Sequence, residues 1–231
     1  MIGVIGGVGF FEADILKTAD VEKIDTPYGA AQMLATDKLV FIPRHGINSK
    51  VPPHKINHHA NIFAFKEKGI TKILGVNSVG SLKKEISPPS ILIPHDYISL
   101  WNIATYYDDK IVHIVPGLDE RLRQSLLSLA QNYGLEVVEK GVYIQTLGPR
   151  LETKAEIHML KNFGDVVGMT MANEATLANE LGLGYTSLCS VDNYAHGLVD
   201  EPLTSETIIG NARMNSRRIR DFILKIAGEL E

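Results

Sequence analysis

The feature that most constrains this chain is the regular alternation of short β-branched runs with helical patterns. The runs lie at residues 2–5, 39–43, 72–76, 90–93, 142–146, 166–169 and 186–191. Several are apolar throughout, which favours strands buried on both faces of a sheet. Strand and helix alternate from end to end, and this predicts an α/β layered fold with a largely parallel, mixed central sheet.

Apolar residues three or four positions apart indicate the helices between the runs. They are Ile56, Ala60 and Phe63; Leu122, Leu126 and Leu129; Ala175, Ala178 and Leu181; and Ile208, Ala212, Ile219, Phe222, Ile223 and Ile226. Thr153 to Glu156 form a capping-box pattern, so a further helix should begin there and leave Glu152 in the preceding loop. Because no linker, repeat or low-complexity segment divides the pattern, residues 1–231 are predicted to form a single domain.

Composition excludes several classes of function. The net charge of −4 gives no electrostatic reason to expect nucleic acid or an anionic membrane as a partner. Cys189 is the single cysteine, so neither an internal disulfide nor a cysteine zinc motif is expected. The chain starts without a basic leader, and no stretch approaches 18 consecutive apolar residues. These features predict a cytoplasmic protein that is neither exported nor membrane-spanning.

Glycines and basic residues follow the first two buried runs. A glycine-rich turn, Gly6, Gly7, Val8 and Gly9, can bring backbone N–H groups to an anion, and a tight turn explains the glycines equally well. Arg44 and His45 follow residues 39–43, where a planar guanidinium suits phosphate or, alternatively, a surface salt bridge.

Three histidines close to one another, His54, His58 and His59, suggest a metal site at first sight. They lack the His-Glu-x-x-His arrangement and have no nearby carboxylate, so no metal is expected. Further runs end at Asn77 and Ser78, at Met169 and Thr170, and at Asp192 and Asn193, and all of these residues except Met169 are polar. In open α/β sheets, ligands bind in the crevice at such strand ends.

The ordered segments around these residues resemble the trimeric-type purine nucleoside phosphorylases, in the branch that includes methylthioadenosine phosphorylase and its 6-oxopurine relatives. The resemblance rests on Gly6 to Gly9, Arg44 to Gly46, Asn57 to Asn61, Gly80 to Leu82, Gly148 to Thr153, Met169 to Met171, Glu174 and Ala175, and Asn193 to Ala195, which together span almost the whole chain. It implies a nucleoside phosphorylase-like three-layer sandwich. It also implies a pentosyltransferase that needs no cofactor, because inorganic phosphate is the second substrate.

The resemblance assigns roles to individual residues. Phosphate would meet Val8 in the glycine turn, Arg44, His45, the backbone of Asn77 and Ser78, and the hydroxyl of Thr170. The nucleoside would meet Met169 under the ribose, Glu152, Asn193, Tyr194 and Ala195 around the base, and Glu206 near the 5′ end. His113 resembles a histidine that a neighbouring subunit lends to the 5′ end, which implies a homo-oligomer, a trimer or a dimer of trimers. As alternatives, Glu206 complements a helix dipole and His113 is an ordinary histidine.

Two positions depart from the family pattern, and three others indicate the base. Val8 replaces a hydroxyl residue and removes about one hydrogen bond to phosphate, and Asp192 stands where threonine is more usual. Asn193 and Ala195 stand where adenine-specific members carry aspartates. The Asn193 amide can donate to the O6 of a 6-oxopurine, and the Glu152 carboxylate can accept from its N1–H. Asn193 and His45 are the residues expected to act in the reaction.

The function predicted is therefore phosphorolysis of inosine and guanosine in purine salvage, with S-methyl-5′-thioinosine or, less favoured, methylthioadenosine as alternative substrates. Two other hypotheses stay open at this stage. One is a nucleoside- or dinucleotide-binding module without phosphorolysis, although the glycine turn lacks the Gly-x-Gly-x-x-Gly pattern. The other is a hydrolase that uses water in place of phosphate.

Overall fold

The computed structural model describes residues 1–7, 19–101 and 103–230. The strands of this part are β1 (Ile2–Gly6), β2 (Asp20–Thr26), β3 (Gly29–Ala35), β4 (Leu39–Pro43), β5 (Lys72–Ser81), β6 (Ser90–Leu92), β7 (Asp96–Ser99), β8 (Val142–Gln145), β9 (Val166–Gly168) and β10 (Gly184–Tyr194). The helices are α1 (His58–Glu67), α2 (Glu120–Asn132), α3 (Lys154–Leu160), α4 (Met171–Glu180) and α5 (Ser205–Ile226), with a short 3-10 turn at Pro53–Lys55.

All of these strands join one mixed sheet. Its main path runs β2, β3, β4, β1, β5, β9, β8, β7, while β10 pairs with β5 and with β6. The ladders β1–β4, β1–β5, β5–β10, β7–β8 and β8–β9 are parallel, and the other four are antiparallel. The predicted α/β fold with a largely parallel, mixed sheet is confirmed.

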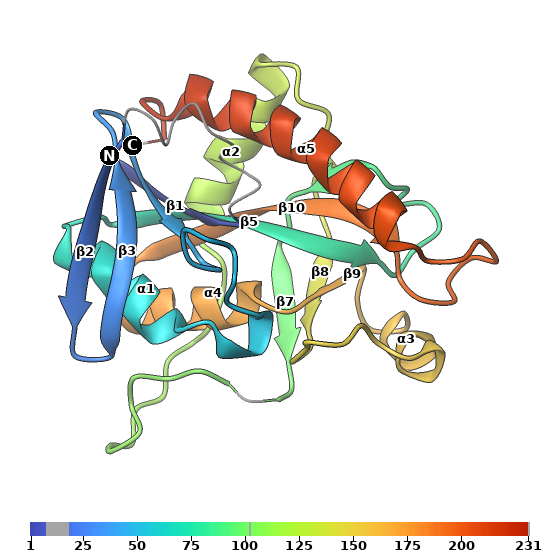
Figure 1. Cartoon of the computed structure of the whole chain (residues 1–231), viewed down its shortest axis with the longest axis horizontal. Coiled ribbons are helices and arrows are strands. Elements are labelled where there is room, and N and C mark those ends of the chain that lie inside the picture. Colours follow the sequence, from blue (N-terminus) through green and yellow to red (C-terminus); the bar gives the residue numbers. More distant parts are fainter. Residues whose placement is uncertain (8–18, 102, 231) are drawn as a thin grey trace.

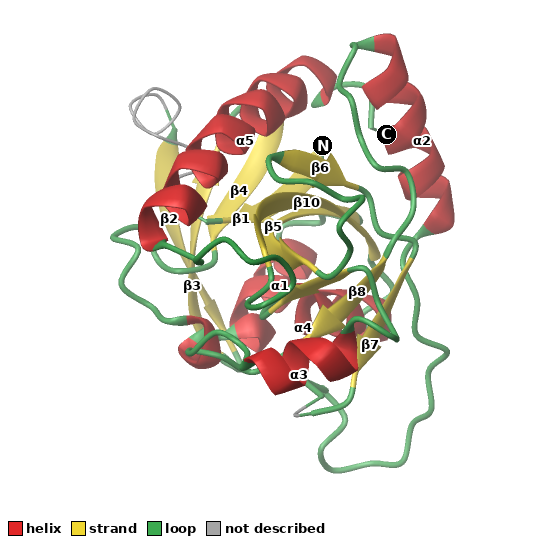
Figure 2. Ribbon diagram, turned by 90° about the vertical axis from the view of Figure 1, so that its right-hand side faces the viewer, coloured by secondary structure: helices red, strands yellow, loops and turns green. Residues whose placement is uncertain are grey.

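Helices cover the sheet on both faces (Figure 1), which gives three layers. On one face, α1 and α4 pack together over a core that includes Ile5, Phe65 and Leu177. On the other face, α2 and α5 enclose a second core that includes Leu74 and Phe222. Figure 2 shows the same arrangement from the side. The strands β1 and β4 are buried at every position because helices cover both of their faces, as their apolar sequences predict.

Local sequence fixes the ends of several elements. The predicted capping box is present at α3: the Thr153 hydroxyl accepts from the Glu156 N–H, and the Glu156 carboxylate accepts from the Thr153 N–H. Two similar side-chain caps begin α2 at Asp119 and α5 at Thr204. None of the helices in the described ranges is long and apolar enough to cross a bilayer.

Candidate active site

A cavity of about 320 Å³ opens where the ends of several strands meet. It is bordered by residues that follow β1, β4 and β9, by residues on β5 and β10, and by one face of α5. Eight residues that the sequence analysis assigned to the site lie around it: Arg44, His45, Ser78, Glu152, Met169, Thr170, Asn193 and Ala195. Residues as far apart in the chain as Arg44 and Ala195 are thus brought to one place, as the strand-end argument predicts.

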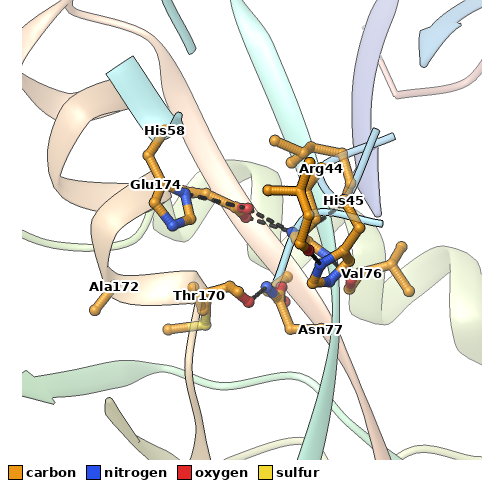
Figure 3. Close-up of polar contacts among 12 residues, drawn as sticks. Arg44, His45, His58, Val76, Asn77, Thr170, Ala172 and Glu174 are labelled. Atoms are coloured by element: carbon orange, nitrogen blue, oxygen red, sulfur yellow. Dashed lines mark hydrogen bonds and ion pairs between the residues drawn. The ribbon is translucent and has the colours of Figure 1, made fainter. Parts of the chain in front are cut away.

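Arg44 borders this cavity, is buried and pairs with Glu174 of α4 (Figure 3). Its Nε and Nη2 donate to the two Glu174 carboxylate oxygens at 2.7 and 3.0 Å. Nη1 donates to the Val76 carbonyl at 2.6 Å, and Nη2 also donates to the Ile5 carbonyl at 3.0 Å. The two parallel N–H groups of Arg44 that we expected to bind phosphate therefore bind Glu174 instead. One N–H on Nη1 is left for a ligand, because a guanidinium has five donors.

The surroundings of Arg44 stabilise its charged form. Burial disfavours the charged guanidinium, but the ion pair and hydrogen bonds with Glu174 outweigh this effect and raise the pKa of Arg44. The Tyr185 hydroxyl also donates to Glu174 at 2.8 Å, and burial raises the pKa of Tyr185 well above its usual value. This tyrosine fits only because residue 75 is glycine, since a Cβ at Gly75 would lie 2.0 Å from the Tyr185 hydroxyl oxygen.

His45 follows Arg44, is half-buried and also borders the cavity. Its Nδ1 lies 2.8 Å from the Val51 carbonyl oxygen, which requires a proton on Nδ1. Burial is the main cause that lowers the pKa of His45, and the nearby Arg44 charge adds to it. The ring is therefore neutral at pH 7, and Nε2 is the nitrogen that can accept a proton from a ligand.

Thr170 occupies the N-cap position of α4 beside the cavity without a capping hydrogen bond from its side chain, and neighbouring side chains fix its orientation. Asn77 donates through Nδ2 to the Thr170 hydroxyl oxygen at 2.8 Å (Figure 3), and its Oδ1 accepts from Ser187. The Tyr143 hydroxyl accepts from the backbone N–H groups of Thr170 and Met171 at 3.0 and 3.3 Å. Because the Thr170 oxygen already accepts from Asn77, its hydroxyl proton can be donated into the cavity.

Glu152 and Asn193 also border the cavity. Glu152 is almost fully buried, and its Oε1 accepts from the Thr146 hydroxyl at 2.6 Å. Asn193 follows an irregularity in the β10 ladder, and its Nδ2 donates to the Tyr194 carbonyl at 2.8 Å. A carboxylate acceptor and a primary amide with a second N–H therefore border the same space, with the small Ala195 beside them.

Comparison of the sequence with known proteins shows which family the chain belongs to. The sequence profile of the Phosphorylase superfamily matches residues 1–227. The chain belongs to this superfamily. It is 46% identical over 222 residues to a probable 6-oxopurine nucleoside phosphorylase of Archaeoglobus fulgidus, a match that covers 94% of this chain and 91% of the relative. It is also 42% identical to a probable S-methyl-5′-thioinosine phosphorylase of Methanocaldococcus jannaschii, covering 96% and 92%.

A solved phosphorylase structure has the same architecture. Methylthioadenosine phosphorylase from Schistosoma mansoni in complex with adenine superposes with a TM-score of 0.90 at 26% identity, covering 98% of this chain and 90% of that one. The expected nucleoside phosphorylase-like fold and family are therefore confirmed.

Several site residues lie elsewhere than this phosphorylase family led us to expect. Asn77 is fully buried behind Thr170 and does not border the cavity. The Tyr194 hydroxyl points away and donates to the Lys84 carbonyl. His113 is exposed in the segment between β7 and α2, outside the cavity of this chain. Val8 lies outside the described residues.

Glu206 also lies outside the cavity of this chain. It is exposed in the first turn of α5 and does not border the cavity. The residues of α5 that do so are Ile208, Ala212 and Ser216. Successive positions four apart share a helix face, whereas Glu206 is about 200° around the helix from Ile208. The α5 side of the cavity is therefore mostly apolar, in contrast to the polar residue that we expected there.

Two acidic residues were missed or left without a role in the sequence analysis. Glu174 was named only as part of a motif, and it is fully buried. The signal for its burial was that it is the one charged residue between Met171 and Ala178. Asp192 is fully buried and borders the cavity.

The histidines at the start of α1 do not form a metal centre in the described residues, where no cluster of three or more metal-ligating side chains occurs. Burial lowers the pKa of His58 to about 4, so its imidazole is neutral and lies close to Glu174. His59 contacts the Thr105 carbonyl instead. The absence of a metal requirement stays a prediction.

Proposed function

We propose that this chain catalyses the reversible phosphorolysis of 6-oxopurine nucleosides, inosine and guanosine, to the free base and ribose 1-phosphate. The observation that supports it most is that a single cavity is bordered by Glu152 and Asn193, which we call its base end, and by Arg44, His45 and Thr170, which we call its anion end. One end offers hydrogen bonds suited to a 6-oxopurine, and the other offers donors and positive charge suited to an anion. We assign the activity to purine salvage in the cytoplasm.

The anion end favours phosphate through several weak contributions. The single available N–H of Arg44, the Thr170 hydroxyl and the backbone at Ser78 can each donate to an oxygen of the anion. The positive end of the α4 dipole lies at Thr170 and favours negative charge there. The first N–H groups of α4 are already bound to Tyr143 and Gln145, so the dipole acts here without direct backbone contacts.

The reaction needs no nucleophile from the protein. Phosphate attacks the anomeric carbon as the bond to the base breaks, and its charge stabilises the positive charge that develops on the sugar. Met169 would lie against the ribose between the two ends. Asn193 would donate to the O6 edge of the base, and this hydrogen bond strengthens in the transition state because the base gains electron density. Glu152 would accept from N1–H and so orient the base.

His45 has a role consistent with its neutral ring. Its unprotonated Nε2 can accept the proton of monohydrogen phosphate, which must finally reach the departing base. No cofactor takes part in this scheme.

A second substrate is favoured by one observation. Ile208 and Ala212 place apolar surface on the α5 side of the cavity, where an apolar 5′ substituent could bind. The similarity to relatives with the name S-methyl-5′-thioinosine phosphorylase supports the same alternative. Methylthioadenosine is less favoured, because its adenine lacks the N1–H that Glu152 would bind.

The experiment that tests this assignment compares kcat/KM for inosine, guanosine, S-methyl-5′-thioinosine, adenosine and methylthioadenosine at saturating phosphate. We expect the three 6-oxopurine nucleosides to be cleaved and the two adenine nucleosides to be poor substrates. Replacing Ile208 with Ser should lower kcat/KM for the methylthio substrate and leave inosine nearly unchanged, if the α5 face binds the 5′ end. Equal efficiency with adenosine and inosine would contradict the assignment.

A further inference from the structure

Asp192 is a buried carboxyl group at the edge of the cavity, and the reaction described above does not use it. Its side chain is fully buried near the end of β10. One carboxyl oxygen accepts from the Ser78 hydroxyl and the other from the Ser190 hydroxyl. Its backbone carbonyl accepts from Asn211 of α5 at 2.9 Å. The carboxyl group therefore connects β5 and β10 beneath the cavity.

The groups packed against Asp192 provide hydrogen bonds but no opposite charge. Strand β5 contributes Ser78, α5 contributes the neutral amides of Asn211 and Asn215, and β6 pairs with β10 through backbone contacts at Ser90 and Ile91. Within the described part of the chain, none of these contacts is a cation. A buried carboxylate without a cationic partner is costly, so its protonated form is favoured.

Burial accordingly raises the pKa of Asp192 to about 6, although hydrogen bonds from Ser190, Ser78 and Asn215 act in the opposite direction. Two other titratable groups have pKa values that differ from that of Asp192. Cys189 on the same strand has a pKa raised by burial to about 12 and stays a neutral thiol. His45, which borders the same cavity, has a lowered pKa and is also neutral at pH 7.

Ser78 links this carboxyl group to the anion end of the cavity. Its hydroxyl contacts Asp192, while its backbone is one of the groups to which we assign phosphate. A phosphate dianion at this end would stand close to an ionised Asp192 with only a serine between them. Like charges at such separation in a partly buried site disfavour simultaneous ionisation.

We propose that Asp192 takes up one proton when a phosphate-like dianion binds in this cavity, so that anion affinity and protonation of this carboxyl group are linked. This inference deepens the proposed function and rests on it for the identity of the anion. The proton comes from solvent, binds a carboxylate oxygen of Asp192 and returns to solvent when the anionic product leaves. Protonated Asp192 then donates to a serine hydroxyl, instead of accepting from both serines.

The sign of the effect follows from linkage. A bound dianion raises the pKa of Asp192 above its value in the free protein, so proton uptake is largest between the two values. Affinity for the anion is highest below pH 6 and falls as the pH rises through this window. Above the window, Asp192 is ionised in both the free and the anion-bound protein, and affinity for the anion is lowest.

Sulfate is the best probe, because it keeps both charges across the whole range and adds no titration of its own. Sulfate binding is measured by isothermal titration calorimetry from about pH 5 to about pH 9 in two buffers of different ionisation enthalpy. The proteins are the unmodified chain, Asp192→Asn and, as a matched control, Ser190→Ala. The control removes a hydrogen bond of the same network without changing charge.

We expect the unmodified protein to take up close to one proton per sulfate near pH 7, with affinity falling by up to about tenfold per pH unit inside the window. Ser190→Ala should keep this uptake but over a window at higher pH, because it removes a hydrogen bond that lowers the pKa of Asp192. Asp192→Asn should lose this uptake and bind sulfate more tightly than the unmodified protein at high pH. Uptake unchanged in Asp192→Asn would assign the proton to another group, such as His45, and overturn the inference. Failure of sulfate to bind the unmodified protein would also overturn it.

A measurement on the unmodified protein covers the case in which Asp192→Asn does not fold. Infrared difference spectra with and without sulfate near pH 7 should show a gain of protonated carboxyl signal, and no gain would contradict the proposal. Inosine phosphorolysis is assayed separately. Sulfate-linked proton uptake in a protein that fails to cleave inosine would retain this inference and reject the proposed function.

Discussion

The Arg44–Glu174 pair shows what a buried charge requires at the scale of a single residue. Both side chains are almost fully buried, and the carboxylate also accepts from Tyr185. We predict that Glu174→Gln destabilises the protein by about 3–5 kcal/mol, because Arg44 is left buried with its charge uncompensated. Urea denaturation at neutral pH measures this loss, provided that the m-value is unchanged.

Glu120→Gln is the matched control for this prediction. Glu120 pairs with the buried Arg123 at 2.7 Å, but the Glu120 side chain is 58% exposed. Water therefore already screens the pair, and we expect a loss of no more than about 1 kcal/mol. Equal losses of unfolding free energy in the two variants would show that burial of the Arg44–Glu174 pair does not increase the cost of removing the carboxylate.

The base-binding residues give a second prediction at this scale. Asn193→Asp should move the preference toward adenine nucleosides, because an ionised carboxylate accepts from the adenine amine and repels O6. Glu152→Ala should weaken guanosine most, because guanine presents both N1–H and a 2-amino group to this side chain. The unmodified site should favour inosine over adenosine by up to roughly 10⁴-fold in kcat/KM.

Glu206→Ala serves as the control for these two variants. Glu206 is exposed on the far side of α5 from the cavity, so we expect kcat/KM for every substrate to stay within about twofold of the unmodified enzyme. A large change in kcat/KM in Glu206→Ala would support the expectation that Glu206 lies at the 5′ end of the nucleoside. No shift toward adenine in Asn193→Asp would reject the assignment of Asn193 to O6.

Among the elements, α3 depends on a short-range hydrogen-bond pair. We predict that Thr153→Ala destabilises the protein by about 1 kcal/mol, because the N-cap hydroxyl no longer accepts from Glu156 N–H. Thr153→Ser keeps the hydroxyl and should keep most of this stability. Urea denaturation of the two variants tests the prediction, and equal losses would contradict it.

The same helix start predicts a dependence of stability on pH. The Arg150 guanidinium and the Thr153 N–H lower the pKa of Glu156 from its ordinary value of 4.5 to about 2. A lowered pKa in the folded state adds stability above pH 4.5 that is lost as the pH falls toward 2. Glu156→Gln should therefore be less stable than the unmodified protein at neutral pH, with the difference vanishing near pH 2. A constant difference across this range would contradict the assignment.

Sequence patterns predicted most of the elements but not all. Buried strands such as β1 and β4 were recognised because every residue in them is apolar. The hairpin of β2 and β3 was missed because it lies at the sheet edge, where its strands contain charged residues and alanines. The short β7 was missed because its four residues offer too little periodicity. The far half of β5 was missed because its small and polar residues, Asn77, Ser78, Gly80 and Ser81, are typical of a turn.

The site was predictable to a similar degree. Residues at strand ends were brought together as expected, because the direction of parallel strands determines where they meet. The direction of individual side chains was not predictable. Whether Arg44 turns to phosphate or to Glu174, and which face of α5 points inward, depends on packing between residues far apart in the chain.

At the scale of the whole molecule, the segment between β7 and α2 exposes an unusual amount of apolar surface. The residues concerned are Leu100 (65%), Trp101 (40%), Ile103 (60%), Ile111 (91%), Val112 (42%) and Val115 (90%). Exposed apolar patches of this kind mark interfaces between proteins. With His113 in the same segment, we predict a homo-oligomer built from trimers, in which His113 reaches the site of a neighbouring copy.

Sedimentation velocity at assay concentration tests this prediction, together with the activity of His113→Ala. We expect a trimer or hexamer, and a variant that keeps its oligomeric state but has a raised KM for nucleoside. A fully active monomer would contradict the prediction, and a variant with unchanged kinetics would remove His113 from the site.

The central claim is that this enzyme uses phosphate, and not water, to cleave a purine nucleoside. The most direct measurement follows hypoxanthine release from inosine in a phosphate-free buffer, before and after addition of inorganic phosphate, with ribose 1-phosphate quantified by ³¹P NMR. We predict that release begins only when phosphate is added and yields one ribose 1-phosphate per hypoxanthine. Release at the same rate without phosphate, with free ribose as the product, would contradict the account.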